Sequence, residues 1–91
     1  SITAIGPNPV TDKLNVIITK KDAVTIKILV HTNWGQKIYS AVNQHSPGKK
    51  IYQIPMRQMA AGIYYVSVFV KALAVFKNSY KHRVCFFIVT F

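Results

Sequence analysis

The amino-acid sequence predicts an all-β fold, an antiparallel β-sandwich of about seven short strands. Two observations indicate it. Apolar and polar residues alternate in several short segments, so that every second side chain faces the same side, as in a half-buried strand. Turn signals rich in Gly, Pro, Asn and Ser separate these segments at short intervals, which is typical of a sandwich. No helix is well supported, and only residues 56–61 could form a single helical turn.

A rigid turn leads into the first predicted strand. Pro7 and Pro9 fix their own φ angles and restrict the residues before them, while Asn8 can hydrogen-bond its own backbone. The strand that follows alternates, and its apolar face carries Leu14, Val16 and Ile18.

The next two strands are predicted over residues 24–31 and 38–42, on either side of a turn at residues 33–36. Gly35 can take a positive φ in this turn at no steric cost. The apolar face of the first of these strands consists of Val24, Ile26, Ile28 and Val30.

The middle of the chain reads as a loop at residues 46–49, a short strand at 51–54 that Pro55 ends, and a corner at 58–62. The clearest inward face follows and consists of Tyr64, Val66, Val68 and Val70. We expect Tyr64 to pack in the core and Tyr65 to be partly exposed, because neighbouring strand residues face opposite sides.

The last segments are a hairpin within residues 71–80, with a strand at 73–76, and a final strand at 84–91. That final strand is apolar on both faces, so we expect it either to lie centrally in the domain or to contact a partner. If its outer face meets a partner, Phe87→Lys should leave folding intact, and global unfolding of this variant would refute the idea.

Length and composition indicate one small domain. The chain has 91 residues, about half of them hydrophobic, and we expect residues 1–91 to be one domain of a longer secreted protein. Lys and Arg interrupt every apolar run, so no transmembrane segment is predicted.

The charge is strongly positive. The chain has twelve Lys and Arg residues and only two acidic residues, Asp12 and Asp22, which gives a formal net charge of +10. Such a field attracts nucleic acid, anionic glycans or lipopolysaccharide. The basic residues are spread along the whole chain, which favours solvated strand faces over a dedicated binding stripe. Nucleic acid ranks last among the partners, because no nucleic-acid-binding motif is present.

The residue inventory argues against catalysis. The two aspartates lie in predicted turn regions, so a carboxylate pair for acid–base work is not expected. Cys85 lies in an apolar strand, where a thiol is usually an inert core group, and a single cysteine allows no internal disulfide. The three histidines lack metal-ligand spacing and suit solvated or hydrogen-bonding roles; they are His31, His45 and His82. We therefore expect no enzyme activity, cofactor or metal site.

Three motifs, in this order, resemble the type A C-terminal sorting domains of the type IX secretion system (the Por secretion system) of Bacteroidetes. They are Pro-Asn-Pro-Val followed by Leu-Asn-Val, then Gly-Gln-Lys-Ile after an apolar strand, and finally Met-Ala-Ala-Gly-Ile-Tyr-Tyr-Val-Ser-Val. Thr32 and Met59 depart from the family's usual Asp or Asn and Leu, and the tail after the third motif is longer than usual. The residues that carry the resemblance are Pro7, Asn8, Pro9, Leu14, Gly35, Lys37, Gly62, Tyr64, Val66 and Val68.

The resemblance implies an Ig-like sandwich that acts as a sorting signal and not as a catalyst. Such a domain directs its cargo protein from the periplasm across the outer membrane, for attachment at the cell surface or release. Its implied partners are the type IX translocon and a sortase-like peptidase, with anionic lipopolysaccharide or glycans as further candidates.

Two questions stay open from the sequence. The domain could instead be an Ig-like adhesive or structural module of a cell-surface protein or filament, since fold does not fix function. The docking residues are also undecided: Trp34 could either dock a partner or cap one end of the sandwich, and the other candidates are Lys81, Arg83 and Phe87.

Overall fold

The computed structural model describes residues 2–5, 13–56, 62–72 and 82–90. The strands are β1 (Ile2–Ile5), β2 (Lys13–Lys20), β3 (Val24–Thr32), β4 (Lys37–His45), β5 (Gly48–Pro55), β6 (Gly62–Ala72) and β7 (His82–Thr90). Side chains are described for Ile2 and for five strands, β2 to β6. The described chain is therefore all-β, as predicted.

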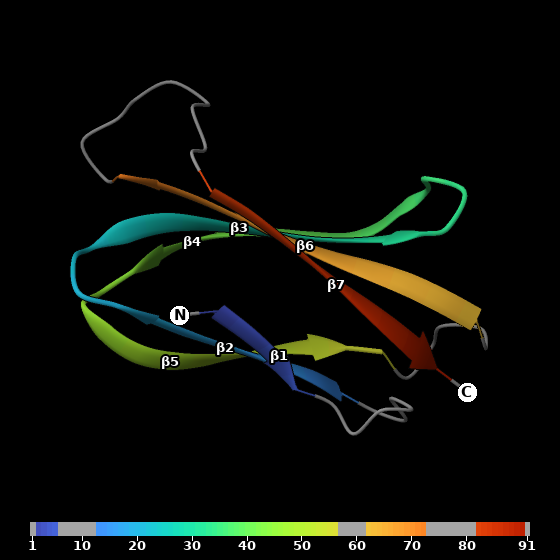
Figure 1. The fold of residues 1–91 in the computed structure, drawn as a ribbon, viewed down its shortest axis with the longest axis horizontal. Coiled ribbons are helices and arrows are strands. Elements are labelled where there is room, and N and C mark those ends of the chain that lie inside the picture. Colours follow the sequence, from blue (N-terminus) through green and yellow to red (C-terminus); the bar gives the residue numbers. More distant parts are fainter. Residues whose placement is uncertain (1, 6–12, 57–61, 73–81, 91) are drawn as a thin grey trace.

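The strands form two antiparallel sheets, which lie one above the other in Figure 1. One sheet has the order β1-β2-β5 and the other the order β4-β3-β6-β7. The chain changes sheet between β2 and β3, between β4 and β5, and between β5 and β6. Consecutive segments thus face each other across the interior, and a single core can form between the sheets.

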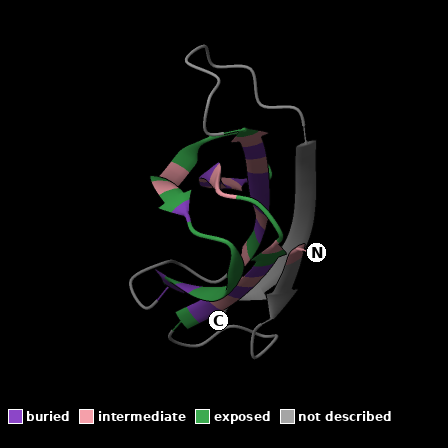
Figure 2. Cartoon of the chain, turned by 90° about the vertical axis from the view of Figure 1, so that its left-hand side faces the viewer, coloured by how far each residue is buried: buried purple, intermediate pink, exposed green. Residues whose placement is uncertain are grey.

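The core lies between the sheets and draws on both. Its side chains come from alternate positions of β2, β3, β5 and β6, which is why buried and exposed bands alternate along these strands in Figure 2. The predicted inward faces of β2, β3 and β6 are confirmed, with Tyr64 buried and Tyr65 only partly so. The buried apolar residues are Leu14, Val16, Ile18, Ile26, Ile28, Val30, Tyr52, Ile54, Met56, Tyr64, Val66, Val68 and Val70.

Two strand boundaries lie three residues from the predicted positions. β5 begins at Gly48, so residues 48 and 49 are not loop; they pair with Lys20 and Thr19 of β2 and complete the antiparallel ladder. β4 runs on to His45, because its last residues still pair with β3 as far as Val24. In both cases polar residues extend a strand that its apolar pattern alone makes shorter.

The two ends of the chain also differ from the prediction. β1 was not predicted, and its four residues pair along β2 from Ile18 to Asn15. β7 pairs with β6 and stands at the end of the strand order, so its central placement is wrong among the described strands. Contact of β7 with a partner stays a prediction. The expected strand at 73–76 and the side chains of Cys85 and Phe87 lie outside what the structure describes.

Candidate functional site

The turn between β3 and β4 carries the most exposed large apolar side chain among the described residues. Trp34 is 75% exposed, so the alternative that it caps the sandwich is wrong. Its indole Nε1 donates a hydrogen bond to Gln36 Oε1 at 3.3 Å, which fixes the ring to its own turn. The apolar face of the ring is left to solvent.

The same turn is held by its backbone and by Thr32. Gly35 N donates to Thr32 O at 3.1 Å, Thr32 N donates to Gln36 O at 2.9 Å, and Gln36 N donates to Thr32 Oγ1 at 3.0 Å. Gly35 has φ +91°, which explains the motif glycine, since an L-residue is strained there. Thr32, a departure from the usual family residue, thus acts as the local acceptor that Asp or Asn would supply.

The remaining motif residues divide between core and surface. Leu14, Tyr64, Val66 and Val68 are buried in the common core, where their size and shape support the fold. Lys37 is exposed beside the Trp34 turn. Gly62 begins β6, next to Tyr64. The prolines and asparagine of the first motif, Pro7, Asn8 and Pro9, lie outside the described residues.

A buried polar contact connects the two sheets, and no pattern in the sequence predicts it. His45, at the end of β4, places Nδ1 2.7 Å from Tyr52 Oη of β5 and Nε2 2.9 Å from Gly48 O. Because a carbonyl oxygen only accepts, Nε2 donates to Gly48, and Nδ1 of the neutral ring then accepts from the Tyr52 hydroxyl. Burial raises the pKa of Tyr52, which keeps that donor protonated.

The histidines therefore have structural surroundings in the part of the chain that is described. His45 is hydrogen-bonded as expected, and His31 stacks on Tyr65 with ring centroids 5.5 Å apart. No three His, Cys, Asp or Glu side chains gather to hold a metal within the described ranges. His82 lies where side chains are not described.

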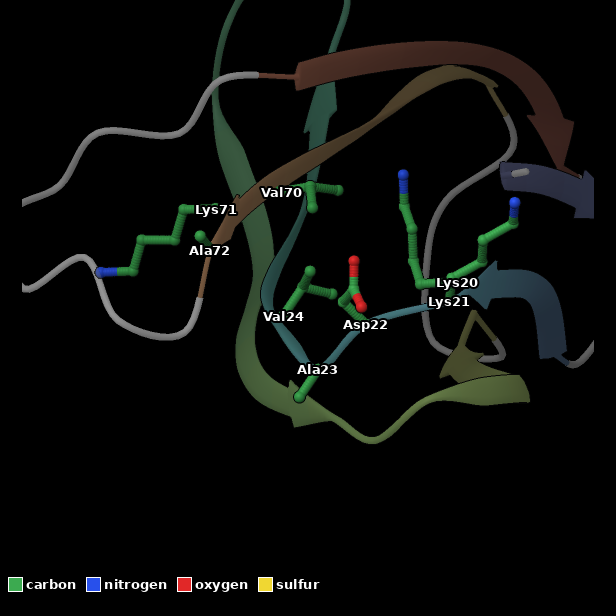
Figure 3. A pocket seen from close by; sticks show the side chains of 8 residues that line it. All are labelled: Lys20, Lys21, Asp22, Ala23, Val24, Val70, Lys71 and Ala72. Atoms are coloured by element: carbon green, nitrogen blue, oxygen red, sulfur yellow. The ribbon is translucent and has the colours of Figure 1, made fainter.

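A surface pocket of about 400 Å³ lies where β2 turns into β3, next to the end of β6. Figure 3 shows Lys20 and Lys21 on one side of Asp22, with Val24 on the other, and Lys71 directed away from them. Three lysines and one aspartate line the pocket, so its lining is net positive, although Lys71 is directed away from the others. Its remaining lining is aliphatic, and its described residues offer no nucleophile with an adjacent base.

Among the residues that the structure describes, no helix is long and apolar enough to cross a membrane. Comparison with curated proteins gave no match. Comparison with protein families matches residues 4–79 to the secretion system C-terminal sorting domain. The match runs through all three motifs and most of the chain. The chain therefore belongs to the family of secretion system C-terminal sorting domains, which are the sorting signals of type IX secretion.

Proposed function

We propose that this domain directs a covalently attached cargo protein through the outer membrane by the type IX machinery, for attachment at the cell surface or release. The observation that carries the proposal is the family match over residues 4–79, which includes the exposed Trp34 turn and the buried residues of the third motif. The match also favours this role over an adhesive or structural module.

A sorting signal of this kind requires a rigid shape that a receptor can recognise. The family is one of sorting signals, not of enzymes. The two sheets around one core, with antiparallel pairing throughout, support an Ig-like sandwich as that shape. We therefore assign the domain a role in recognition, with the chemistry left to its partners, the translocon and a sortase-like peptidase.

The Trp34 turn is the docking element that we propose for this recognition. Its ring is exposed while its polar Nε1 is already satisfied, so binding a partner there does not leave a buried donor unpaired. The turn is braced by Thr32, so little conformational entropy is lost on docking. Lys81, Arg83 and Phe87 remain further candidates whose side chains the structure does not describe.

Anionic lipopolysaccharide or glycans are candidate partners after export. The support is the net charge of +10, together with lysines on several described strands and turns. Because exposed charges are screened at physiological ionic strength, this charge serves encounter more than specific recognition.

A secretion assay tests the proposal. A fluorescent protein with an N-terminal export signal is fused ahead of residues 1–91 and expressed in a Bacteroidetes host with an intact type IX system. We expect fluorescence at the surface or in the medium, and periplasmic retention when the translocon is deleted. The same reporter without residues 1–91 is the control, and retention of the full fusion in both strains would contradict the proposal.

A further inference from the structure

The outer side of the four-stranded sheet carries a group of apolar and aromatic side chains from three adjacent strands. The inward positions of β3 are Ile26, Ile28 and Val30, so the residues between them face away from the core. Antiparallel register places the neighbouring strands' outward residues beside them. We call this group the outer platform, and it consists of Leu29, Val42, Ile63, Tyr65 and Phe69.

The outer platform is accessible yet well supported. Val42 is 59% exposed and Ile63 is 40% exposed, while the other members are partly exposed. Ser67 lies between Tyr65 and Phe69 on the same strand face and is fully buried. Stacking of His31 on Tyr65 fixes the aromatic end of the group.

Positive charge borders and crosses the outer platform. Lys27 lies between Val42 and Phe69, since it is the registered partner of both. Lys37 lies opposite His31 at one end, and Lys71 lies opposite Thr25 at the other. No carboxylate belongs to this face among the described residues. The complementary surface is therefore apolar, with carboxylates opposite Lys27 and at its edge.

The outer side of the other sheet differs in kind. There Ile17 and Ile51 pair with each other, and the described residues around them on β2 and β5 are polar or basic, including Gln53 and Lys49. The described part of this face has no aromatic residue on β2 or β5, although aromatic side chains supply much of the binding energy at protein interfaces. The two faces thus form a natural pair of test and control surfaces.

We propose that the outer platform binds a protein of the secretion machinery whose apolar patch carries carboxylates opposite Lys27 and at its border. The proposal rests on the proposed function and adds to it a second recognition surface, besides the Trp34 turn, and the chemistry of the partner. A second copy of the chain is disfavoured, because a two-fold contact would bring the same lysines against each other. A polyanionic glycan would match the lysines but leave the apolar and aromatic side chains unused.

Paired charge-reversal variants in the secretion fusion test the proposal. The test variant combines Lys27→Glu with Val42→Glu, and the matched control combines Lys49→Glu with Ile51→Glu. Both make the same chemical changes at a lysine and an exposed aliphatic residue of an outer sheet face. We expect export of the test variant to fall about tenfold or more and export of the control to stay within about twofold, with similar unfolding midpoints for both.

The outcomes separate this proposal from the function on which it rests. Failure of the unchanged fusion to leave the periplasm would contradict the proposed function itself. Normal export of the unchanged fusion together with normal export of the test variant would overturn the outer platform alone. Equal loss of export in both variants would also overturn it, because net charge rather than this face would then decide recognition.

Site-specific crosslinking identifies the occupant and remains informative if a charge-reversal variant does not fold. A photoreactive amino acid replaces Val42 in one fusion and Ile51 in another. Crosslinks at position 42, but not at 51, to a protein of the machinery would support the proposal. Crosslinks at position 42 to a second copy of the fusion or to lipopolysaccharide would overturn it.

Discussion

Tyr52 and His45 form the buried polar contact that joins the sheets, and each depends on the other. His45 accepts a hydrogen bond from the Tyr52 hydroxyl at Nδ1 and donates one from Nε2 to the Gly48 carbonyl oxygen. Lys50 Nζ lies 5.1 Å from the centroid of the Tyr52 ring, which adds a cation–π contact at the rim. A network of this kind stabilises only when all its members are satisfied.

Removal of the Tyr52 hydroxyl should therefore be costly. In Tyr52→Phe the ring still packs in the core, but His45 Nδ1 loses its donor in a buried position. We expect the free energy of unfolding to fall by about 1–3 kcal/mol, the cost of a buried polar group left unpaired. Urea denaturation measures it, and Tyr39→Phe, at a partly exposed tyrosine, is the control. Equal stability of Tyr52→Phe and the unchanged chain would show that the contact contributes nothing.

The same residue predicts a dependence on alkaline pH. Burial raises the pKa of Tyr52 above its usual value of 10.0, so the folded state holds this proton when the unfolded state has begun to lose it. The resulting contribution is fully present below pH 10 and is lost as the pH rises through the folded-state pKa. We expect the free energy of unfolding to fall more steeply above pH 10 in the unchanged chain than in Tyr52→Phe. Parallel curves for the two proteins would contradict this.

At the scale of the elements, the Trp34 turn depends on the backbone conformation of Gly35. A Cβ there would meet nothing within 4 Å, so the cost of Gly35→Ala comes from φ +91° and not from a clash. We expect the free energy of unfolding to fall by about 1 kcal/mol. Gly62→Ala is the matched control, since its Cβ would make only an ordinary contact of 3.9 Å with Tyr64 Cε2. Greater destabilisation by Gly62→Ala than by Gly35→Ala would refute this account of the turn.

β2 illustrates how the core depends on a single motif residue. Leu14 is fully buried between the sheets, so Leu14→Ala should lower the free energy of unfolding by about 2–5 kcal/mol, through lost burial and a cavity. Val42→Ala, at an exposed position of β4, should change it by no more than about 0.5 kcal/mol. Thermal or chemical denaturation compares the two. Similar losses from both would mean that Leu14 is not a core residue.

The elements also show what the sequence could predict. β2, β3 and β6 were predicted because apolar residues occupy every second position, and their inward faces are confirmed. β1 was missed because its four residues are too few to show a period, and the start of β5 was missed because it is polar. Strand ends of this kind are set by pairing with a neighbour, which a single segment does not reveal.

The candidate surfaces were only partly predictable for a similar reason. Trp34 stood out because a large aromatic residue in a turn beside glycine has few core neighbours. The outer platform could not be predicted in this way. Alternation of apolar and polar residues separates the two faces of one strand, but it does not say which strands lie side by side. Likewise, the hydrogen bond from Tyr52 to His45 depends on a change of sheet between β4 and β5.

At the scale of the whole molecule, the two sheets divide the motif residues into those that hold the shape and those that display it. The motif residues Leu14, Val66 and Val68 lie in the core, whereas the motif residue Lys37 lies on the surface, beside the exposed Trp34. The family assignment therefore has a physical interpretation. One set of residues forms the core between the sheets, and the other lies on the surface where we propose that the secretion machinery recognises the domain.

The most direct test of the sorting role is the fraction of fused reporter found outside the outer membrane, measured in parallel in a type IX-competent host and its translocon-deleted counterpart. We predict a large extracellular or surface fraction in the first strain and only a background fraction in the second, with equal amounts of intact fusion in both. Equal fractions of reporter outside the outer membrane in the two strains would contradict the account, because export would then not depend on the type IX machinery.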